Sequence, residues 1–296
     1  MIGVAIVNYN AAWVLRRCLK SLADNAARRV VVIDNGSSDG SAELVHREFP
    51  DVDLRVEPNR GYGAGANLAV RLLATPYVLL LNPDTEVAPG TARALASYLE
   101  EHPYVAVAGP RLVNGEGVYE PSAHAFPTPI SLLVQESGLS RRLGLRRGEW
   151  QAGPADWVLG AAVAIRCAAF DAVGGFDEGY VLYQEEVDLC HRLRAVGWET
   201  HYAPVATVVH VGGVSTSRRE AETFAQFVRS TQRFARQRLS RRRAVGVRVV
   251  LAAVLVARIA RDAPQLALSR DRVRRERLRR RLARWLSGLL ALRDAR

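Results

Sequence analysis

Apolar runs of strand type alternate with stretches of helical spacing along the first 113 residues. The strand-like runs lie at residues 2–9, 29–34, 52–57, 77–82 and 105–113. The helix-like stretches between them lie at residues 12–26, 41–48, 64–74 and 90–102. Strands and helices that alternate at this spacing form βαβ crossovers. The pattern therefore predicts an α/β fold, with a mostly parallel sheet flanked by helices.

The pattern becomes less regular after residue 113. Residues 114–155 are rich in glycine, proline and polar residues, which predicts a loop-rich insertion. A helix is predicted at residues 185–196, because apolar residues recur there at helical spacing and Gly197 would end it. The apolar run at residues 205–209 predicts one more strand, with His210 at its end.

Polar side chains follow each of the first four predicted strands. The carboxyl ends of parallel strands meet at one edge of the sheet, where open α/β sheets bind ligands. Glycines in such loops let a ligand approach the backbone, and the helix N-termini that follow favour anions. Four loops of this kind together predict a nucleotide site. Their residues include Asn8, Tyr9 and Asn10; Asp34 to Gly40; Asn59, Gly61 and Asn67; and Asn82 and Asp84.

Two residues at strand ends have both a structural and a catalytic interpretation. Asp84 follows a predicted buried strand and Pro83. Aspartate is common in turns, so this residue taken alone is best interpreted as a turn cap. The neighbouring polar loops favour a metal ligand instead. His210 lies beside two glycines, and its imidazole either ligates a metal or makes a structural hydrogen bond.

The predicted helix at residues 185–196 begins with three acids. Glu185, Glu186 and Asp188 occupy its first turn, where the helix dipole favours carboxylates. Asp188 and Arg192 have the spacing of an ordinary ion pair on a helix. A purely structural role for these acids is therefore a strong alternative to catalysis.

A glycine pattern in the third loop matches a dinucleotide-binding fingerprint. Gly61, Gly63 and Ala66 have the spacing G-x-G-x-x-A after a strand. That fingerprint belongs at the first strand–helix turn, however, and here it is in the third. The first turn contains no glycine. These observations argue against an NAD(P)-dependent oxidoreductase.

Composition narrows the class of protein further. A chain of 296 residues with 49% hydrophobic residues can bury a large core. The three cysteines are widely spaced, which argues against a disulfide scaffold or a zinc site and fits a reducing compartment. The N-terminus enters a strand pattern directly and lacks the features of a signal peptide. A cytoplasmic location is therefore expected.

Charge is unevenly distributed along the chain. The net charge is +11, but residues 218–296 hold 23 Arg, no Lys and 6 acids, a net charge of +17. Residues 1–217 carry a net charge of −6. Such asymmetry indicates a folded body with a basic interaction segment. We accordingly expect a catalytic domain at residues 1–226 and a basic helical tail at residues 227–296.

The tail is predicted to lie on a membrane surface rather than to span it. Its longest uncharged apolar run, residues 249–257, is far shorter than the ~20 residues that a spanning helix needs. An arginine-rich face opposite leucine and tryptophan is typical of an interfacial helix on anionic lipid. A solvated charged helix, or one that packs on its own chain or a second copy, is the alternative, and nucleic acid is not an expected partner. The apolar stripe is Leu278, Leu282, Trp285 and Leu289, and the arginines are Arg274, Arg275, Arg277, Arg279, Arg280, Arg281 and Arg284.

Seven motifs occur in a fixed order along the chain. They are VNYN (7–10), IDNGSSDGS (33–41), NRGYGAGAN (59–67), LLNPD (80–84), GGFDE (174–178), YQEEVDLCHRLRAVGW (183–198) and VVHVGG (208–213). This ordered set resembles the motifs of the family 2 glycosyltransferases, and most of all their bacterial rhamnosyltransferase-like branch. The resemblance implies a GT-A fold and inverting transfer of a sugar from a nucleotide-diphosphate donor to an acceptor hydroxyl. It also implies Mg²⁺ or Mn²⁺ as cofactor and a glycan or lipid-linked acceptor in cell-envelope synthesis.

The same resemblance implies roles for single residues on the donor side. Asp84 matches the last acid of the family's D-x-D motif and would bind the metal, with His210 as a late metal or phosphate ligand. Asn82 stands where the first acid is usual, which lowers the negative charge available to the ion. Asp34 would accept a hydrogen bond from the base. The remaining nucleotide contacts would come from Asn8, Tyr9, Asn10, Asn59, Gly61 and Asn67.

The resemblance also implies a general base and an acceptor side. Glu186 matches the family's base, although an aspartate is usual there, and Glu185 is the fallback. The acceptor would meet Trp157, Gly160, Gly175, Phe176 and Asp177. A metal-dependent nucleotidyltransferase is disfavoured because the first loop lacks a glycine- and Lys/Arg-rich phosphate site. A nucleotide-sugar binder without activity is disfavoured because both glutamates are present.

Overall fold

The computed structural model describes residues 1–23, 25, 29–136, 149–212 and 220–293. Its contacts divide the chain into two compact units, which we describe separately. The sheet unit comprises Met1–Ala125, Arg147–Val181 and Glu185–Ser215. The helical unit comprises Phe126–Arg146, Leu182–Gln184 and Thr216–Arg296.

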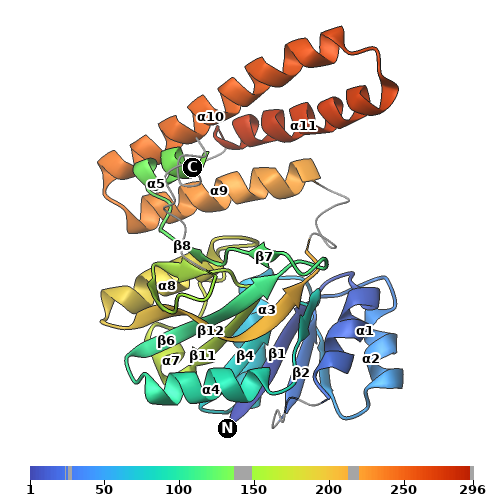
Figure 1. The fold of residues 1–296 in the computed structure, drawn as a ribbon, viewed down its shortest axis with the longest axis vertical. Helices are drawn as coiled ribbons and strands as arrows, with labels where there is room; N and C mark the ends of the chain where they lie inside the picture. The colour runs from blue at the N-terminus through green and yellow to red at the C-terminus, as the bar shows by residue number, and fades with distance from the viewer. Residues whose placement is uncertain (24, 26–28, 137–148, 213–219, 294–296) are drawn as a thin grey trace. The chain divides into compact units, whose positions relative to one another are not determined.

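A mixed β-sheet forms the centre of the sheet unit (Figure 1). Its main path has the order β3-β2-β1-β4-β11-β6-β12-β5, with β7 beside β6 and β9 beside β12, while β8 and β10 form a separate pair. The strands are β1 (Ile2–Asn8), β2 (Val30–Asp34), β3 (Asp53–Val56), β4 (Tyr77–Leu81), β5 (Thr85–Val87), β6 (Val105–Val113), β7 (Tyr119–Glu120), β8 (Ala123–His124), β9 (Gly153–Ala155), β10 (Trp157–Val158), β11 (Ala162–Arg166) and β12 (Glu199–His210).

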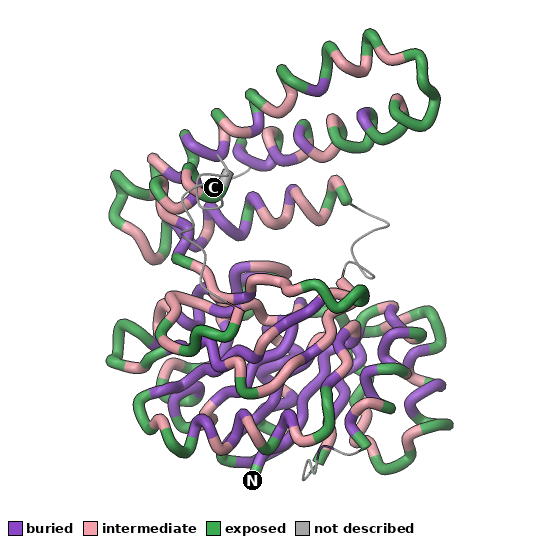
Figure 2. Tube along the Cα trace, in the orientation of Figure 1, coloured by how far each residue is buried: buried purple, intermediate pink, exposed green. Residues whose placement is uncertain are grey.

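Helices cover both faces of this sheet, because alternate residues of a strand point to opposite sides. On β1, Val4 and Ile6 belong to one hydrophobic core, which includes residues of α1, α2 and α4. Ala5 and Val7 belong to a second core, which includes residues of α3, α7 and α8. The central strands are buried along their length (Figure 2). The helices are α1 (Ala12–Ser21), α2 (Ser41–Glu48), α3 (Tyr62–Leu73), α4 (Thr91–Glu101), α7 (Cys167–Ala172) and α8 (Glu185–Ala195).

The predicted parallel pairing is confirmed for the first four strands and recurs between β6 and β12, while antiparallel strands in the second half make the sheet mixed. Strands β3, β2, β1 and β4 are parallel neighbours. Strand β11 runs antiparallel to both β4 and β6. The chain enters β11 at the edge where β4 ends, since the Asn82 amide donates to the Ala161 carbonyl (2.8 Å). A strand that starts at that edge runs back against β4 without a crossover helix.

Most predicted elements occur within one to three residues of their expected bounds. Strand β6 has the predicted bounds, while β12 begins at Glu199 instead of residue 205. Helix α1 ends at Ser21, earlier than predicted; residues 24 and 26–28 lie outside the described part of the chain. Helix α8 ends just before Gly197, which has a φ of 92°.

The helical unit contains α5 (Pro129–Glu136), α9 (Glu220–Arg238), α10 (Arg241–Leu268) and α11 (Arg272–Ala291) (Figure 1). Helix α9 extends across the predicted domain boundary at residue 226, and α5 comes from the predicted insertion. Trp285 packs edge-to-face on Phe224 of α9 at 5.3 Å and donates a hydrogen bond to the buried Asp262 of α10 (3.0 Å). These contacts join three helices into one core.

The apolar stripe of α11 is part of this core. Leu278 and Trp285 are 3% and 7% exposed, and Leu289 packs against the same cluster. The stripe predicted to face a membrane therefore packs on its own chain, as in the alternative interpretation. Within the described residues, no helix is both long enough and apolar enough to span a bilayer.

Candidate active site

The first two polar loops are joined by hydrogen bonds at the sheet edge. The Asn8 side chain donates to Asp34 (2.8 Å) and to Ser37 (3.2 Å), and the Ser37 amide donates to Asp34 (2.7 Å). Asn10 has a φ of 50° and accepts from the Ser38 amide (2.8 Å). Parallel pairing of β1 and β2 places Asn8 opposite Asp34. The loops therefore form one preorganised polar surface.

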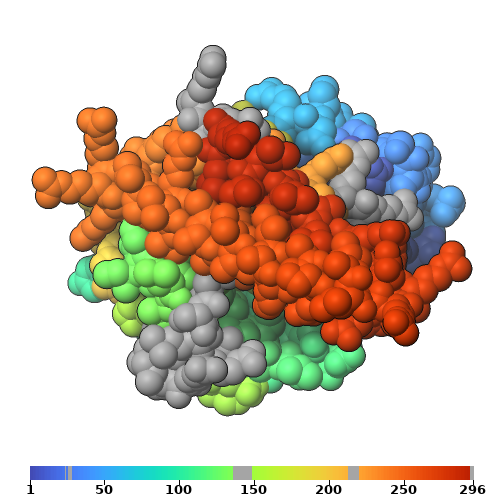
Figure 3. Space-filling model, turned by 90° about the horizontal axis from the view of Figure 1, so that it is seen from above, coloured from blue at the N-terminus to red at the C-terminus, as the bar shows by residue number. Residues whose placement is uncertain are grey.

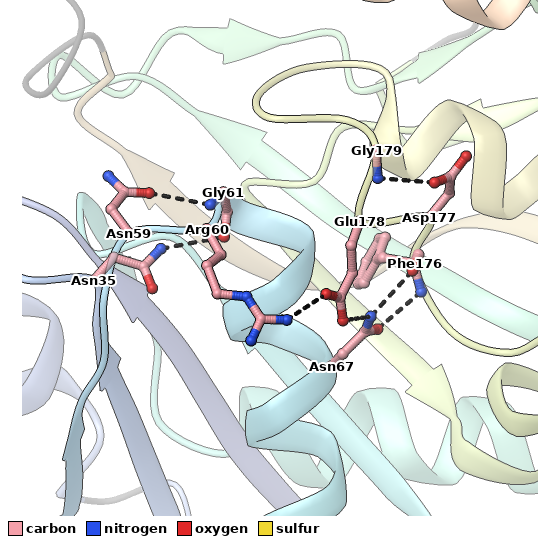
Figure 4. A network of polar contacts seen from close by, with 9 residues as sticks. All are labelled: Asn35, Asn59, Arg60, Gly61, Asn67, Phe176, Asp177, Glu178 and Gly179. Carbon is pink, nitrogen blue, oxygen red and sulfur yellow. Dashed lines mark hydrogen bonds and ion pairs between the residues drawn. The ribbon is translucent and has the colours of Figure 1, made fainter.

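The third loop is held against the second. The Asn35 side chain donates to the Gly61 carbonyl (3.2 Å), and Asn59 accepts from the Gly61 amide (3.1 Å) (Figure 4). Gly61 has a φ of 98°, and a Cβ there would lie 2.9 Å from the Val181 carbonyl oxygen. Only glycine suits that close backbone approach.

Asn67 connects α3 to the turn at residues 175–178. Its amide group donates to the Phe176 carbonyl (3.0 Å) and accepts from the Phe176 amide (2.9 Å) (Figure 4). It also donates to Glu178 (3.1 Å), which forms an ion pair with Arg60 (3.0 Å). Asn67 is buried, so its visible role is to position this turn.

The predicted acceptor residues fall into two groups. Gly175, Phe176 and Asp177 belong to the turn held by Asn67. The Phe176 ring is 3% exposed and packs edge-to-face on Phe170 at 5.4 Å, so it presents no open face to a sugar. Asp177 accepts from the Gly179 amide (2.8 Å).

Trp157 and Gly160 lie beside the candidate base. A Cβ at Gly160 would lie 3.6 Å from Oε1 of Glu186, and α8 packs beside β10. Trp157 is half-buried; it stacks on His124 at 4.6 Å and donates to the Ala125 carbonyl (2.9 Å).

Strand pairing brings Asp84 and His210 together from distant parts of the chain. Strands β12 and β5 are antiparallel, with His210 opposite Thr85, and the Val211 amide donates to the Asp84 carbonyl (2.9 Å). His210 Nε2 lies 3.7 Å from Asp84 Oδ1. His210 Nδ1 lies 2.9 Å from a carboxylate oxygen of Glu120. Glu120 thus holds the imidazole with Nε2 directed toward Asp84.

Burial shapes the electrostatics of this pair. Desolvation raises the pKa of Asp84 above its ordinary value, although His210 opposes the rise. Burial lowers the pKa of His210, but its contacts with Glu120 and Asp84 outweigh that effect and raise the pKa overall. A cation beside Asp84 would offset the cost of burying its charge.

The Asp84–His210 pair fits a divalent cation. Two ligands that each lie about 2.1 Å from one ion are at most about 4.2 Å apart, and 3.7 Å is within that limit. A carboxylate that orients a ligating histidine through its other nitrogen is a common arrangement at metal sites. In the described part of the chain, no group of three or more His, Cys, Asp or Glu could hold an ion by itself. Mg²⁺ is often held by one or two carboxylates and completed by substrate phosphates and water.

Three acids and a tyrosine share one neighbourhood at this edge. The hydroxyl of Tyr62 is buried, and its pKa is raised by burial and then by the charges of Glu185, Glu186 and Asp84. Burial, reinforced by the charge of Glu186, raises the pKa of Glu185 well above its ordinary value. Glu186 is half-buried. The charges of the candidate bases and of the candidate metal ligand therefore all act on the Tyr62 hydroxyl.

The third acid of α8, Asp188, has a structural role. It is fully buried and forms an ion pair with Arg192 (2.7 Å). Arg192 also donates to the carbonyls of Val173 and Gly175, each at 2.6 Å. This confirms the ion pair expected from helical spacing.

Glu120 and Tyr62 were missed by the sequence interpretation. Tyr62 lies within a motif that was singled out, and its neighbour Gly61 was chosen instead. Glu120 is in the irregular segment after β6, where no periodicity indicates which side chain faces the sheet edge. Strain at Tyr183 and Gln184, which have φ values of 65° and 68° directly before α8, was also not predictable.

Comparison with known families agrees with this geometry. The family model described as “Glycosyl transferase family 2” matches residues 3–173. The chain belongs to this family. The match spans β1 to α7, so it includes the four polar loops of this glycosyltransferase.

Two curated relatives are rhamnosyltransferases. This glycosyltransferase is 32% identical over 267 residues to the N-acetylglucosaminyl-diphospho-decaprenol L-rhamnosyltransferase of Mycobacterium tuberculosis, covering 81% of this chain and 85% of the relative. It is 26% identical over 251 residues to rhamnosyltransferase WbbL of Escherichia coli strain K12, covering 81% and 94%.

A solved structure supports the fold. The mannosyltransferase PcManGT of Pyrobaculum calidifontis, in complex with GDP-Man and Mn²⁺, aligns with a TM-score of 0.57 at 18% identity, covering 99% of this chain and 86% of that one. The predicted GT-A fold is confirmed.

Proposed function

We propose that this glycosyltransferase moves rhamnose from a nucleotide-diphosphate donor to a hydroxyl of a lipid-linked or glycan acceptor in cell-envelope synthesis. Two observations carry the proposal: His210 lies 3.7 Å from Asp84, and the charges of Asp84, Glu185 and Glu186 all act on the buried Tyr62 hydroxyl. The names of the relatives support the sugar and the lipid-linked acceptor. A nucleotidyltransferase is not favoured, because the family is one of glycosyltransferases.

The polar loops form the donor side of the site. Asp34 accepts two hydrogen bonds from its own chain, and an ionised carboxylate has about four acceptor positions, so it can also accept from a base N–H. Asn67 positions the turn at residues 175–178 instead of contacting the nucleotide. Asn82, which is half-buried directly after β4, would contact the ribose. The other nucleotide contacts are Asn8, Tyr9, Asn10, Asn59 and Gly61.

Asp84 and His210 would hold Mg²⁺ or Mn²⁺, with Glu120 orienting the imidazole. When bound, the ion would neutralise the charge that develops on the leaving diphosphate. Because Asn82 replaces a usual acid, Asp84 supplies the only carboxylate of that motif.

Glu186 acts as the general base. A sugar hydroxyl is a weak nucleophile until its proton is removed, and a positioned base contributes about 10²–10⁴-fold in rate. Glu186 takes the acceptor proton as the acceptor oxygen bonds to the anomeric carbon. The diphosphate departs from the opposite face, which inverts the configuration. Trp157 and Gly160 border the acceptor, and Glu185 is the alternative base.

The proposed location is the cytoplasmic face of a membrane. A lipid-linked acceptor is confined to a bilayer, while nucleotide sugars are soluble. The basic helical unit would associate with anionic lipid there.

Thermal unfolding tests the donor and metal assignments. We expect the Tm to rise with a dTDP-, UDP- or GDP-sugar, and to rise more when Mn²⁺ or Mg²⁺ is present. Asp84→Asn should abolish the additional rise in Tm that the metal ion causes. Glu86→Gln, a change to a nearby acid that pairs with Arg17, should retain that additional rise. Absence of stabilisation by any nucleotide sugar would contradict the proposed donor class.

A further inference from the structure

The outward face of α10 is a continuous apolar surface. Val245, Val249 and Val256 are 56%, 60% and 54% exposed. Exposed alanines continue the same side at helical spacing (Ala253, Ala260, Ala263 and Ala267). The opposite side supplies Val247, Val250, Leu251 and Leu255 to the core of the helical unit. Figure 2 shows this alternation of buried and exposed segments along α10.

This surface, which we call the α10 outer face, is about 33 Å long at 1.5 Å per residue from Val245 to Ala267. A soluble helix normally places charged residues on its exposed side. The stripe from Val245 to Ala267 carries no charged residue. Arginines lie at its edges, with Arg248 on one side and Arg243 and Arg261 on the other at helical spacing.

The surroundings of the face are strongly basic. Residues 241–293 contain 16 arginines and three acids. Asp262 is buried and pairs with Arg261 and Arg281, and Glu276 pairs with Arg280, so little negative charge is presented. Beside the turn after α10, a hollow of about 680 Å³ is lined in part by Arg274, Arg277 and Arg281. Figure 3 shows α10, in orange, with α11 beside it.

We propose that the α10 outer face lies on an anionic lipid surface, with the flanking arginines at the headgroups. The inference rests on the membrane location proposed above, and names the surface responsible. An apolar stripe bordered by arginines fits an interfacial helix, because arginines near anionic lipid add electrostatic attraction to the burial of the apolar side chains. Nucleic acid would engage the arginines but offer nothing to the apolar stripe. A second copy would bring two strongly positive surfaces together, which charge repulsion opposes.

Matched triple variants test this assignment. In the full-length protein, Val245→Thr, Val249→Thr and Val256→Thr remove three exposed apolar groups without changing charge or shape. The control is Val56→Thr, Val118→Thr and Val196→Thr, at valines that are 59%, 58% and 60% exposed. Thermal unfolding establishes that both variants fold. Sedimentation with phosphatidylglycerol–phosphatidylcholine vesicles measures binding.

We expect the wild type and the control to bind equally and the α10 variant to bind about tenfold more weakly, since each buried methyl contributes up to about 0.8 kcal/mol. Binding should also fall as salt or phosphatidylcholine content rises.

Equal binding by the two triple variants would overturn the assignment of this face while leaving the membrane location intact. Absence of binding by the wild type would overturn both. A wild-type dimer that the α10 variant dissociates would assign the face to a second copy, and tight duplex-DNA binding without vesicle binding would assign the basic surface to nucleic acid.

Discussion

At the scale of single residues, the candidate metal site joins three side chains from separate segments of the sheet unit. Asp84 precedes β5, Glu120 lies on β7 and His210 ends β12. The fixed sheet brings His210 Nε2 to 3.7 Å from the Asp84 carboxylate. Glu120 affects metal binding without contacting the ion, because its contact with His210 Nδ1 leaves Nε2 as the nitrogen that can ligate a metal.

Glu120→Gln should weaken metal binding without removing a ligand. The amide keeps the shape but loses the charge that favours an Nδ1–H on His210. Loss of a carboxylate behind a ligating histidine typically costs about 10–100-fold in metal affinity. Titration of Mn²⁺ by electron paramagnetic resonance measures this directly. Glu116→Gln, an exposed acid four residues earlier, is the control, and equal affinities in the two variants would remove Glu120 from the site.

Glu185→Gln should stabilise the fold at neutral pH. Burial raises the folded-state pKa of Glu185 above its unfolded value, so folding favours the neutral acid. That contribution is complete below the unfolded pKa and is lost as pH rises through the folded pKa. Glutamine copies the neutral form at every pH. The Tm of the variant should exceed that of the wild type near pH 8 and match it near pH 4; the reverse order would show that Glu185 is stabilised as a carboxylate.

At the scale of elements, the sequence was sufficient to predict strands β1 to β4 and the polar loops that follow them. Apolar runs bounded by polar residues predict buried parallel strands, and parallel strands bring their carboxyl ends to one edge. The second half of the sheet was not predictable in this way. Short strands such as β5 and β7 carry too little periodicity, and the antiparallel pairing that brings His210 to Asp84 connects residues 126 positions apart.

The turn at residues 174–178 offers a sharp test of element packing. Gly174 and Gly175 have φ values of 76° and 71°, so alanine at either position costs about 1–2 kcal/mol. A Cβ at Gly175 would lie 2.6 Å from Asn67 Oδ1, while a Cβ at Gly174 would have nothing within 4 Å. Gly175→Ala should therefore lower the free energy of unfolding by at least about 2 kcal/mol more than Gly174→Ala. Chemical denaturation compares them, and equal losses would mean that the Asn67–Phe176 contact contributes little.

At the scale of the whole molecule, the candidate active site belongs to the sheet unit and most of the positive charge belongs to the helical unit. The charge asymmetry and the helical character of the basic segment were evident in the sequence, and so was an apolar stripe on α11. Periodicity alone does not tell which of two amphipathic helices turns its apolar side inward. The structure assigns the α11 stripe, with Trp285, to the core and leaves the valines of α10 exposed. The proposed membrane surface is therefore on α10 instead of α11, because packing within the helical unit buries the α11 stripe.

The same division explains why the proposed membrane role is tested by point variants and not by truncation. A chain that ends at residue 226 would cut α9 within its span and remove the helices that pack on α5. Loss of lipid binding in such a fragment would not distinguish a missing surface from a disrupted core.

The central claim is that Glu186 deprotonates the acceptor while the polar loops and Asp84 hold the donor. The most direct test is to measure transfer rate and donor binding side by side in Glu186→Gln and Glu185→Gln. Glu186→Gln should keep the donor dissociation constant within about twofold and lose about 10²–10⁴-fold in kcat, because only basicity is removed. Glu185→Gln should retain most of its turnover. Near wild-type kcat in Glu186→Gln, with Glu185→Gln inactive, would contradict the assignment and transfer the role to the neighbouring residue.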